Sequence, residues 1–181
     1  MRLSNTLLLS MLLCVGTLNA QTFQTESGTA VFHSQVPLHS FSGTSDHLIG
    51  MINLDDNSVD FYLDLETLET GIGKRDRDMR ETLETEEFPF AEFFGELTSE
   101  FDINSDAEQP VTASGKFTIH GVENDIEVEG TLQKTNEGLL LKADWILLLK
   151  DYDIEPPSLL FVKVDQEQKI EIEALLKPVD N

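Results

Sequence analysis

The fold is decided by residues 111–122, which read VTASGKFTIHGV. Apolar or small side chains stand at every second position from Val111 to Ile119, and polar side chains stand between them. Because successive side chains of a β-strand point to opposite faces, this alternation predicts a strand with one dry and one wet face. The pair His120-Gly121 interrupts the pattern, and a second alternating segment runs from Ile126 to Leu132. The stretch therefore predicts a β-hairpin.

The same period of two recurs along the rest of the chain. Clear alternation marks residues 59–66, 91–97 and 169–176, and weaker strand signals mark residues 30–36, 47–54 and 139–148. Strands with one wet face are typical of antiparallel sheets. The sequence therefore predicts an all-β fold of about eight antiparallel strands, closed into a barrel or packed as a sandwich.

One segment departs from the strand pattern. Between Lys74 and Thr85, Met79 and Leu83 lie four residues apart among charges and good helix formers, which predicts a short surface helix. Residues 104–110 and 136–138 are polar and lack a period, so they predict loops, and Glu155-Pro156-Pro157 predicts a turn. The sequence contains no internal repeat and no low-complexity linker, which favours a single domain over residues 21–181.

The charge balance excludes several classes of partner. The chain has 34 acidic and 12 basic side chains and a formal net charge of −22. Nucleic acids and anionic membrane surfaces would both be repelled by such a protein. Its hydrophobic content of 40% is nevertheless that of an ordinary globular domain. An apolar small molecule or a cationic partner is compatible with this composition.

Residues 1–20 have the features of a secretory signal peptide. Arg2 supplies a positive charge, an apolar run follows from Leu7 to Val15, and Ala20 is a small residue at the expected cleavage site. The alternatives are a retained anchor, for which the apolar run is short, and lipidation of Cys14, where the preceding leucines are atypical. Cleavage would remove Cys14, the single cysteine, and with it disulfide or thiol chemistry. We therefore expect a periplasmic or secreted protein without a stable membrane anchor.

Three stretches of the chain resemble the YceI-like family. They are the charged segment 74–79 followed by 87–93, the hairpin motif 111–122, and the segment 151–156 before the last strand. The resemblance implies a lipocalin-like antiparallel barrel that binds a polyisoprenoid lipid, such as a quinone or polyprenyl chain. Many members of the family have histidine where this chain has Asp78, so no role of that histidine is carried over.

Seven apolar residues on the expected inner faces are candidates for lining a ligand site: Phe61, Leu63, Phe93, Phe117, Ile119, Ile126 and Val128. Small residues on the same faces would leave space beside the rings: Ala91, Gly95, Ala113, Gly115 and Gly130. Alternatively, the rings simply fill the core and the glycines mark strand kinks. His120 could orient a ligand headgroup, or it could bond a carbonyl group at the turn.

Catalytic and metal signals are weak in this sequence. His33, His39, His47 and His120 have no metal-ligand spacing, and no nucleophile elbow is present. Residues 102–106 have the alternate oxygen spacing of a calcium loop but lack its glycine and its closing glutamate. We therefore expect a binding or carrier protein without metal, cofactor or catalytic residue. The alternatives are a ligand-free envelope structural or interaction protein and, third, a hydrolase of lipid-like substrates. The sequence does not specify the oligomeric state.

The signal-peptide assignment makes a direct prediction. Protein recovered from the extracytoplasmic fraction should begin at Gln21, because the small residue Ala20 ends the apolar segment. Intact-mass measurement or N-terminal sequencing checks this. Recovery of a chain that retains Met1, or that carries a lipid on Cys14, would contradict the assignment.

Overall fold

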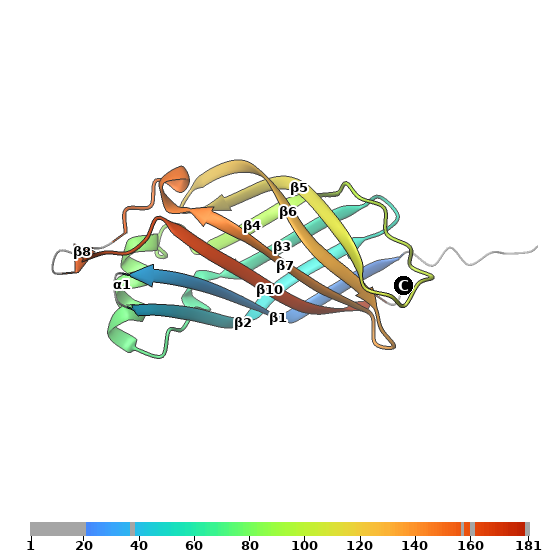
Figure 1. Cartoon of the computed structure of the whole chain (residues 1–181), viewed down its shortest axis with the longest axis horizontal. Coiled ribbons are helices and arrows are strands. Elements are labelled where there is room, and N and C mark those ends of the chain that lie inside the picture. Colours follow the sequence, from blue (N-terminus) through green and yellow to red (C-terminus); the bar gives the residue numbers. More distant parts are fainter. Residues whose placement is uncertain (1–20, 37–38, 157, 160–161, 180–181) are drawn as a thin grey trace, which may run out of the picture.

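Eight antiparallel strands form one closed barrel in the computed structural model (Figure 1). The structure describes residues 21–36, 39–156, 158–159 and 162–179. The order around the barrel is β1-β10-β7-β6-β5-β4-β3-β2. The strands are β1 (Thr22–Val36), β2 (His39–Asn53), β3 (Ser58–Asp64), β4 (Phe90–Leu97), β5 (Gln109–Ile119), β6 (Val122–Lys134), β7 (Leu139–Leu148) and β10 (Glu167–Pro178). The prediction of an all-β antiparallel barrel with about eight strands is confirmed.

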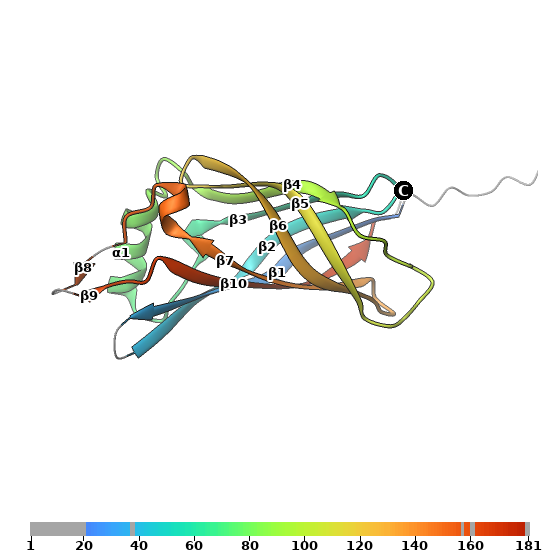
Figure 2. The ribbon, with the colours of Figure 1, turned by 45° about the horizontal axis from the view of Figure 1, so that its top comes forward.

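Helix α1 (Gly73–Leu83) lies across one end of the barrel, together with the small hairpin β8 (Ser158–Leu159) and β9 (Val162–Lys163), as Figures 1 and 2 both show. Two single-turn 3-10 helices, η1 (Leu65–Thr67) and η2 (Leu149–Tyr152), lie after β3 and β7. The predicted helix is confirmed within two residues at each end. No helix in the described part of the chain is both long and apolar enough to cross a membrane.

Strands β1 and β2 are much longer than residues 30–36 and 47–54, the segments in which the sequence indicates strands. The register between them shifts on either side of Gly28, and the pairing of β1 with β10 also shifts between Gln24 and Thr29. Such a bulge interrupts the alternation of inward and outward side chains. The first part of each strand therefore lacks the alternation that marks the rest in the sequence. Strand β5 likewise begins at Gln109, inside the segment that the sequence predicts to be a loop.

The predicted hairpin forms between β5 and β6. Ile119 pairs with Val122, so the loop consists of His120 and Gly121, which have positive φ angles of 55° and 71°. Two central residues with positive φ are typical of the type I′ turn that matches the twist of a hairpin. A Cβ atom on Gly121 would also lie 2.5 Å from the ring of Phe88. Both conformation and space therefore require glycine at this position.

Two of the expected space-making glycines have another role. Gly95 pairs with Gly115 across β4 and β5, and a Cβ atom on either would lie within 2.7 Å of the other residue's Cα atom. The absence of side chains lets the two backbones approach closely, as glycine in a strand often does. Gly95 and Gly115 are thus part of the strand packing, and the prediction that they leave room for a ligand is wrong.

Asp76 anchors α1 to the segment that precedes it. Its carboxylate is buried and accepts hydrogen bonds from the backbone N–H of Thr70, at 2.8 Å, and from the Thr70 hydroxyl. These bonds, helped by the nearby Arg80 and Arg75, hold the pKa of Asp76 below its ordinary value. The negative form of Asp76 therefore fixes the start of the helix.

The predicted signal segment, residues 1–20, and its cleavage site lie outside the described residues. Gln21 is the first described residue, and its carbonyl group accepts a hydrogen bond from the backbone N–H of Leu54 at 2.9 Å.

The close approach of β4 and β5 predicts a clear stability effect. Gly115→Ala would place a Cβ atom 2.4 Å from the Phe94 carbonyl oxygen, and we expect it to lower the free energy of unfolding by about 1–3 kcal/mol. Urea denaturation measures this change. Gly73→Ala is the control, because a Cβ atom there meets nothing within 4 Å. Equal stability of the two variants would contradict the prediction.

The lowered pKa of Asp76 predicts a pH dependence. A carboxylate whose pKa is lower in the folded state adds stability above its unfolded pKa, and this stability is lost as the pH falls through the folded value. Asp76→Asn should therefore destabilise the protein at neutral pH, with a smaller effect below about pH 4. Thermal unfolding across this range is the measurement. Asp60→Asn removes the same charge from the outer wall and should not reproduce the pattern.

Candidate ligand cavity

A cavity of about 480 Å³ occupies the interior of the barrel. All eight barrel strands contribute to its wall, and α1 contributes at one end. Folded proteins usually contain only small voids, whereas ligand pockets commonly measure about 300–1,000 Å³. The barrel is therefore not completely filled by its own side chains.

The structure brings six of the seven predicted lining residues to the cavity wall: Phe61, Leu63, Phe93, Phe117, Ile119 and Val128. Ile126 packs against the core opposite Gly115 but is not part of the wall. Among the predicted small residues, Ala91, Ala113 and Gly130 line the cavity.

Three phenylalanines form a row across the inner face of β3, β4 and β5. Phe61 pairs with Phe93, and Phe93 pairs with Phe117. Gly50 on β2 lies directly opposite Phe61, and a Cβ atom on Gly50 would be 2.0 Å from the ring of Phe61. Because Gly50 has no side chain, the ring can lie against strand β2.

Several wall residues were not predicted from the sequence. Trp145 on β7 lines the cavity, with its ring edge-on to Phe117 at a centroid distance of 5.8 Å. Phe32 and Phe41 also line it and pack edge-on to each other at 6.0 Å. In β7 both faces carry apolar residues, and in β1 the apolar residues Val31 and Phe32 are adjacent, so no period separated inward from outward positions. One feature of the sequence could have drawn attention to Trp145 as a candidate wall residue, because it is the single tryptophan of the chain.

Charged residues gather where α1 meets the cavity. The guanidinium of Arg75 lies 4.4 Å from the ring centroid of Phe41 and donates a hydrogen bond of 2.9 Å to the Thr70 carbonyl oxygen. Lys74 pairs with Asp78 at 2.5 Å, one helical turn away. Lys74, Arg75 and Asp78 all line this end of the cavity. Here the chain has an intrahelical ion pair that involves Asp78.

His120 connects three elements at the same end of the barrel. Its Nδ1 lies 3.0 Å from the carbonyl oxygen of Tyr152 in η2, and its Nε2 lies 3.6 Å from the carboxylate of Glu84, directly after α1. Its ring packs against Phe88 at 5.5 Å. His120 does not line the cavity. These contacts correspond to the second alternative from the sequence, in which His120 bonds a carbonyl group.

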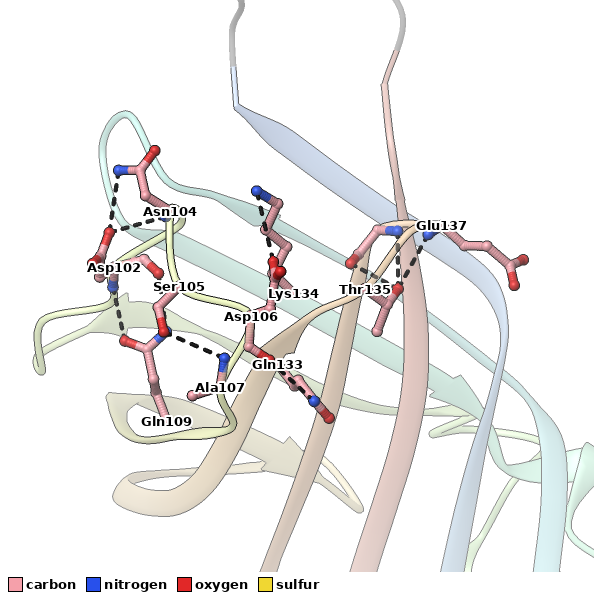
Figure 3. A network of polar contacts seen from close by, with 11 residues as sticks. Asp102, Asn104, Ser105, Asp106, Ala107, Gln109, Gln133, Lys134, Thr135 and Glu137 are labelled. Carbon is pink, nitrogen blue, oxygen red and sulfur yellow. Dashed lines mark hydrogen bonds and ion pairs between the residues drawn. The ribbon is translucent and has the colours of Figure 1, made fainter.

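The segment with calcium-like spacing lies at the end of the barrel opposite α1 (Figure 1) and forms a hydrogen-bonded loop (Figure 3). The Asp102 carboxylate accepts from the backbone N–H of Asn104 at 2.9 Å, and the Gln109 carboxamide bonds the backbone of Asp102. Lys134 lies 4.0 Å from Asp106. The described residues contain no group of three His, Cys, Asp or Glu side chains placed to hold a metal ion.

Comparisons with known structures agree with the barrel fold. A polyisoprenoid binding domain from Saccharophagus degradans, implicated in plant cell wall breakdown, has a TM-score of 0.74 at 16% identity, covering 88% of this chain and 99% of that one. BcnA from Burkholderia cenocepacia has a TM-score of 0.69 at 12% identity, covering 82% and 94%. The YCEI protein of Campylobacter jejuni has a TM-score of 0.55 at 17% identity, covering 74% and 83%.

The family relationship extends over most of the sequence. A search of curated proteins finds no match to the chain. Residues 20–176, however, match the family described as the YceI-like domain. This range includes all eight strands of the barrel except the last two residues of β10, and it includes the three stretches that carry the sequence resemblance. The chain therefore belongs to the YceI-like family.

Proposed function

We propose that the protein is an extracytoplasmic binding or carrier protein that holds an amphiphilic, largely apolar molecule of the polyisoprenoid type in its barrel. The observation that carries this proposal is the cavity of about 480 Å³ inside a closed barrel, with a wall that consists mainly of aliphatic and aromatic side chains. A cavity of this size and character suits an apolar ligand.

Burial of a hydrocarbon chain would supply the binding energy. Removing apolar surface from water contributes about 0.8 kcal/mol per CH₂ group, so each five-carbon isoprene unit contributes up to about 4 kcal/mol. The cost of ordering the ligand reduces this gain. A branched, unsaturated chain would pack against the row of Phe61, Phe93 and Phe117.

The family and one structural relative support the class of ligand. The Saccharophagus degradans domain is described as polyisoprenoid binding, and its barrel superposes on nearly nine tenths of this chain. The signal-like features of residues 1–20 support a location outside the cytoplasm.

Binding without chemistry fits the polar groups of the cavity best. Ser34 is a wall residue with a potentially nucleophilic hydroxyl, but it lies opposite Gln168, which is not a base. Its Oγ atom has no hydrogen-bond partner among the described residues. A hydrolase would need a nucleophile in contact with a general base.

A second candidate function is favoured by one feature of the outer wall. Phe94 on β4 is 65% exposed, and nearby Tyr62 and Phe90 are exposed and pack edge-on at 6.0 Å. Exposed aromatic residues on an acidic surface suit a partner with basic and apolar groups. In this alternative the protein is an envelope interaction protein and the cavity has no ligand.

The two candidates differ in the lipid content of the purified protein. Under the proposal, gently purified protein should contain an isoprenoid lipid, detected by organic extraction and mass spectrometry. Ala113→Phe should reduce the lipid content several-fold, because the new ring would occupy cavity volume. Circular dichroism would show that this variant keeps its barrel.

Glu127→Gln is the matched control, since Glu127 is exposed on the outer face of β6. Its lipid content should equal that of the unchanged protein. If native preparations repeatedly contain no lipid, the carrier proposal fails and the interaction protein becomes the better explanation.

A further inference from the structure

We infer that the outer face of β2, β3 and β4 is a docking surface for a basic amphipathic segment of a partner protein, in which arginine and apolar side chains share one face. The surface lies outside the barrel and the cavity lies inside, since neighbouring residues of a strand point to opposite faces. A partner bound there leaves the cavity free, so a carrier can dock with or without its ligand. The surface is therefore a second site, additional to the proposed carrier function and compatible with it.

Exposed apolar side chains gather on this face. The described residues have six large apolar side chains that are exposed, and four of them form what we call the outer apolar patch: Met51 on β2, Tyr62 on β3, and Phe90 and Phe94 on β4. Met51 and Phe94 pair with the same residue of β3 from its two sides, so their strands are about 10 Å apart. Tyr62 packs edge-on against Phe90 at 6.0 Å. Clustered apolar side chains on the surface of a soluble domain mark a contact site for another molecule.

Two carboxylates lie among these side chains. Asp60 on β3 pairs with both Met51 and Phe94, and Glu92 on β4 pairs with Tyr62. Both acidic side chains are exposed. Neither one forms an ion pair with a basic side chain in the described part of the chain. The patch therefore combines apolar surface with two negative charges that the described residues do not neutralise.

The face that carries the patch lacks lysine and arginine. Strands β2, β3 and β4 contain neither residue. Lys116 on β5 is the cross-strand partner of Phe94. Its ammonium group, however, lies 2.9 Å from the carboxylate of Asp125 and 3.5 Å from that of Glu123, both on β6 and thus on the side away from β4. Because Lys116 is already paired in this way, the face has no free cation from its neighbour.

Acidic residues on the opposite side of the barrel are arranged differently. On β7 and β10, Lys169 lies 2.7 Å from Glu171 and 3.6 Å from Asp144. On the same two strands, Lys142 lies 3.6 Å from Glu173. Lysines of the chain itself thus accompany the acids of that wall. By contrast, the face of β2, β3 and β4 is complementary to cations that another molecule supplies.

Arginine is the residue best suited to this face. Its guanidinium can stack on an aromatic ring and donate paired hydrogen bonds to a carboxylate. The protein contains a stacked pair elsewhere, since the guanidinium of Arg75 lies 4.4 Å from the ring centroid of Phe41. Asp60 and Glu92 are diagonal neighbours on adjacent strands, about 7–8 Å apart. Two arginines one helical turn apart can reach both carboxylates, while a leucine on the same face contacts Phe94.

Other occupants fit this face less well. In a two-fold dimer the patch would face its own copy, so that Asp60 and Glu92 of both chains would meet as like charges. A lipid surface would have to desolvate the same two carboxylates. Standard protein interfaces contain about 20–30 residues on each side, more than the patch provides. The surface therefore suits a transient contact with a basic protein segment.

The experiment measures binding of three synthetic helical peptides of about 18 residues to the mature protein by fluorescence anisotropy. The first peptide carries arginine and leucine on one face, the second has serine in place of leucine, and the third has glutamate in place of arginine. We expect the first peptide to bind at least about tenfold more tightly than the second, and the third not to bind. Raising the salt concentration from about 0.05 M to about 0.5 M should weaken binding of the first peptide several-fold.

The apolar part of the surface is tested by Phe94→Ser. This variant should weaken binding of the first peptide about tenfold, because the ring is the most exposed member of the patch. Ile146→Ser is the matched control, since Ile146 is an exposed apolar residue on the outer face of β7, outside the patch. The control should change the affinity less than about twofold.

The charged part is tested by the double variant Asp60→Asn with Glu92→Gln. It should weaken binding of the first peptide about tenfold and reduce the salt dependence. Glu127→Gln with Glu129→Gln removes the same two charges from the outer face of β6 and is the matched control. Because the net charge changes equally in both double variants, a difference between them reports the position of the carboxylates.

The outcomes distinguish a docking surface from general attraction to an acidic protein. Equal effects of the patch variants and their controls, or no binding of the first peptide, would overturn the inference. Binding to phosphatidylcholine vesicles that is lost in Phe94→Ser would assign the patch to a lipid surface instead. A dimer in analytical ultracentrifugation that is lost in the same variant would assign it to a second copy. The lipid content of all four variants should equal that of the unchanged protein, so the carrier proposal is tested separately.

Discussion

The pairing of β1 with β10 is the constraint on which the other features depend. These strands come from the two ends of the domain, and their ladder closes a sheet in which neighbouring strands otherwise follow one another in sequence, with the separate β8–β9 hairpin between β7 and β10. Closure removes the free edges that an open sheet of this length would expose. It also turns every inward-facing side chain toward one interior. The apolar cavity is thus a consequence of the closed ladder and of the side chains chosen to face it.

Glycine and phenylalanine together determine how much of that interior stays empty. Gly95 and Gly115 bring two strands close, and Gly50 lets the ring of Phe61 lie against β2 instead of projecting to the barrel axis. Gly43 has the same relation to Phe32, because a Cβ atom on Gly43 would lie 2.2 Å from that ring. Large rings held flat on the wall leave a central space. The same rings pointing inward would fill an eight-stranded barrel.

The sequence was informative where each strand has one wet and one dry face. In β3 the buried and exposed residues alternate without exception from Val59 to Leu63, and the inward residues Phe61 and Leu63 line the cavity. It was uninformative where this contrast is lost. In residues 30–36 of β1 and in β7 apolar residues stand on both faces, so Phe32 and Trp145 were not predicted. Ser34 was not predicted either, since a serine in a strand gives no sign of the face it occupies.

The outer face of the barrel wall is acidic and the inner face is apolar, and the two faces have different roles. Outward strand positions carry many of the acidic residues that contribute to the net charge, for example Glu127 and Glu129 on β6 and Glu171 and Glu173 on β10. Like charges on the outer wall oppose self-association and attraction to anionic surfaces, so the exterior does not select an apolar ligand. Selection must therefore take place inside, where the wall offers shape, apolar contact and very few polar groups. In such a wall each unpaired donor has a large influence, because the low polarity around it makes an unmade hydrogen bond costly and a made one strong.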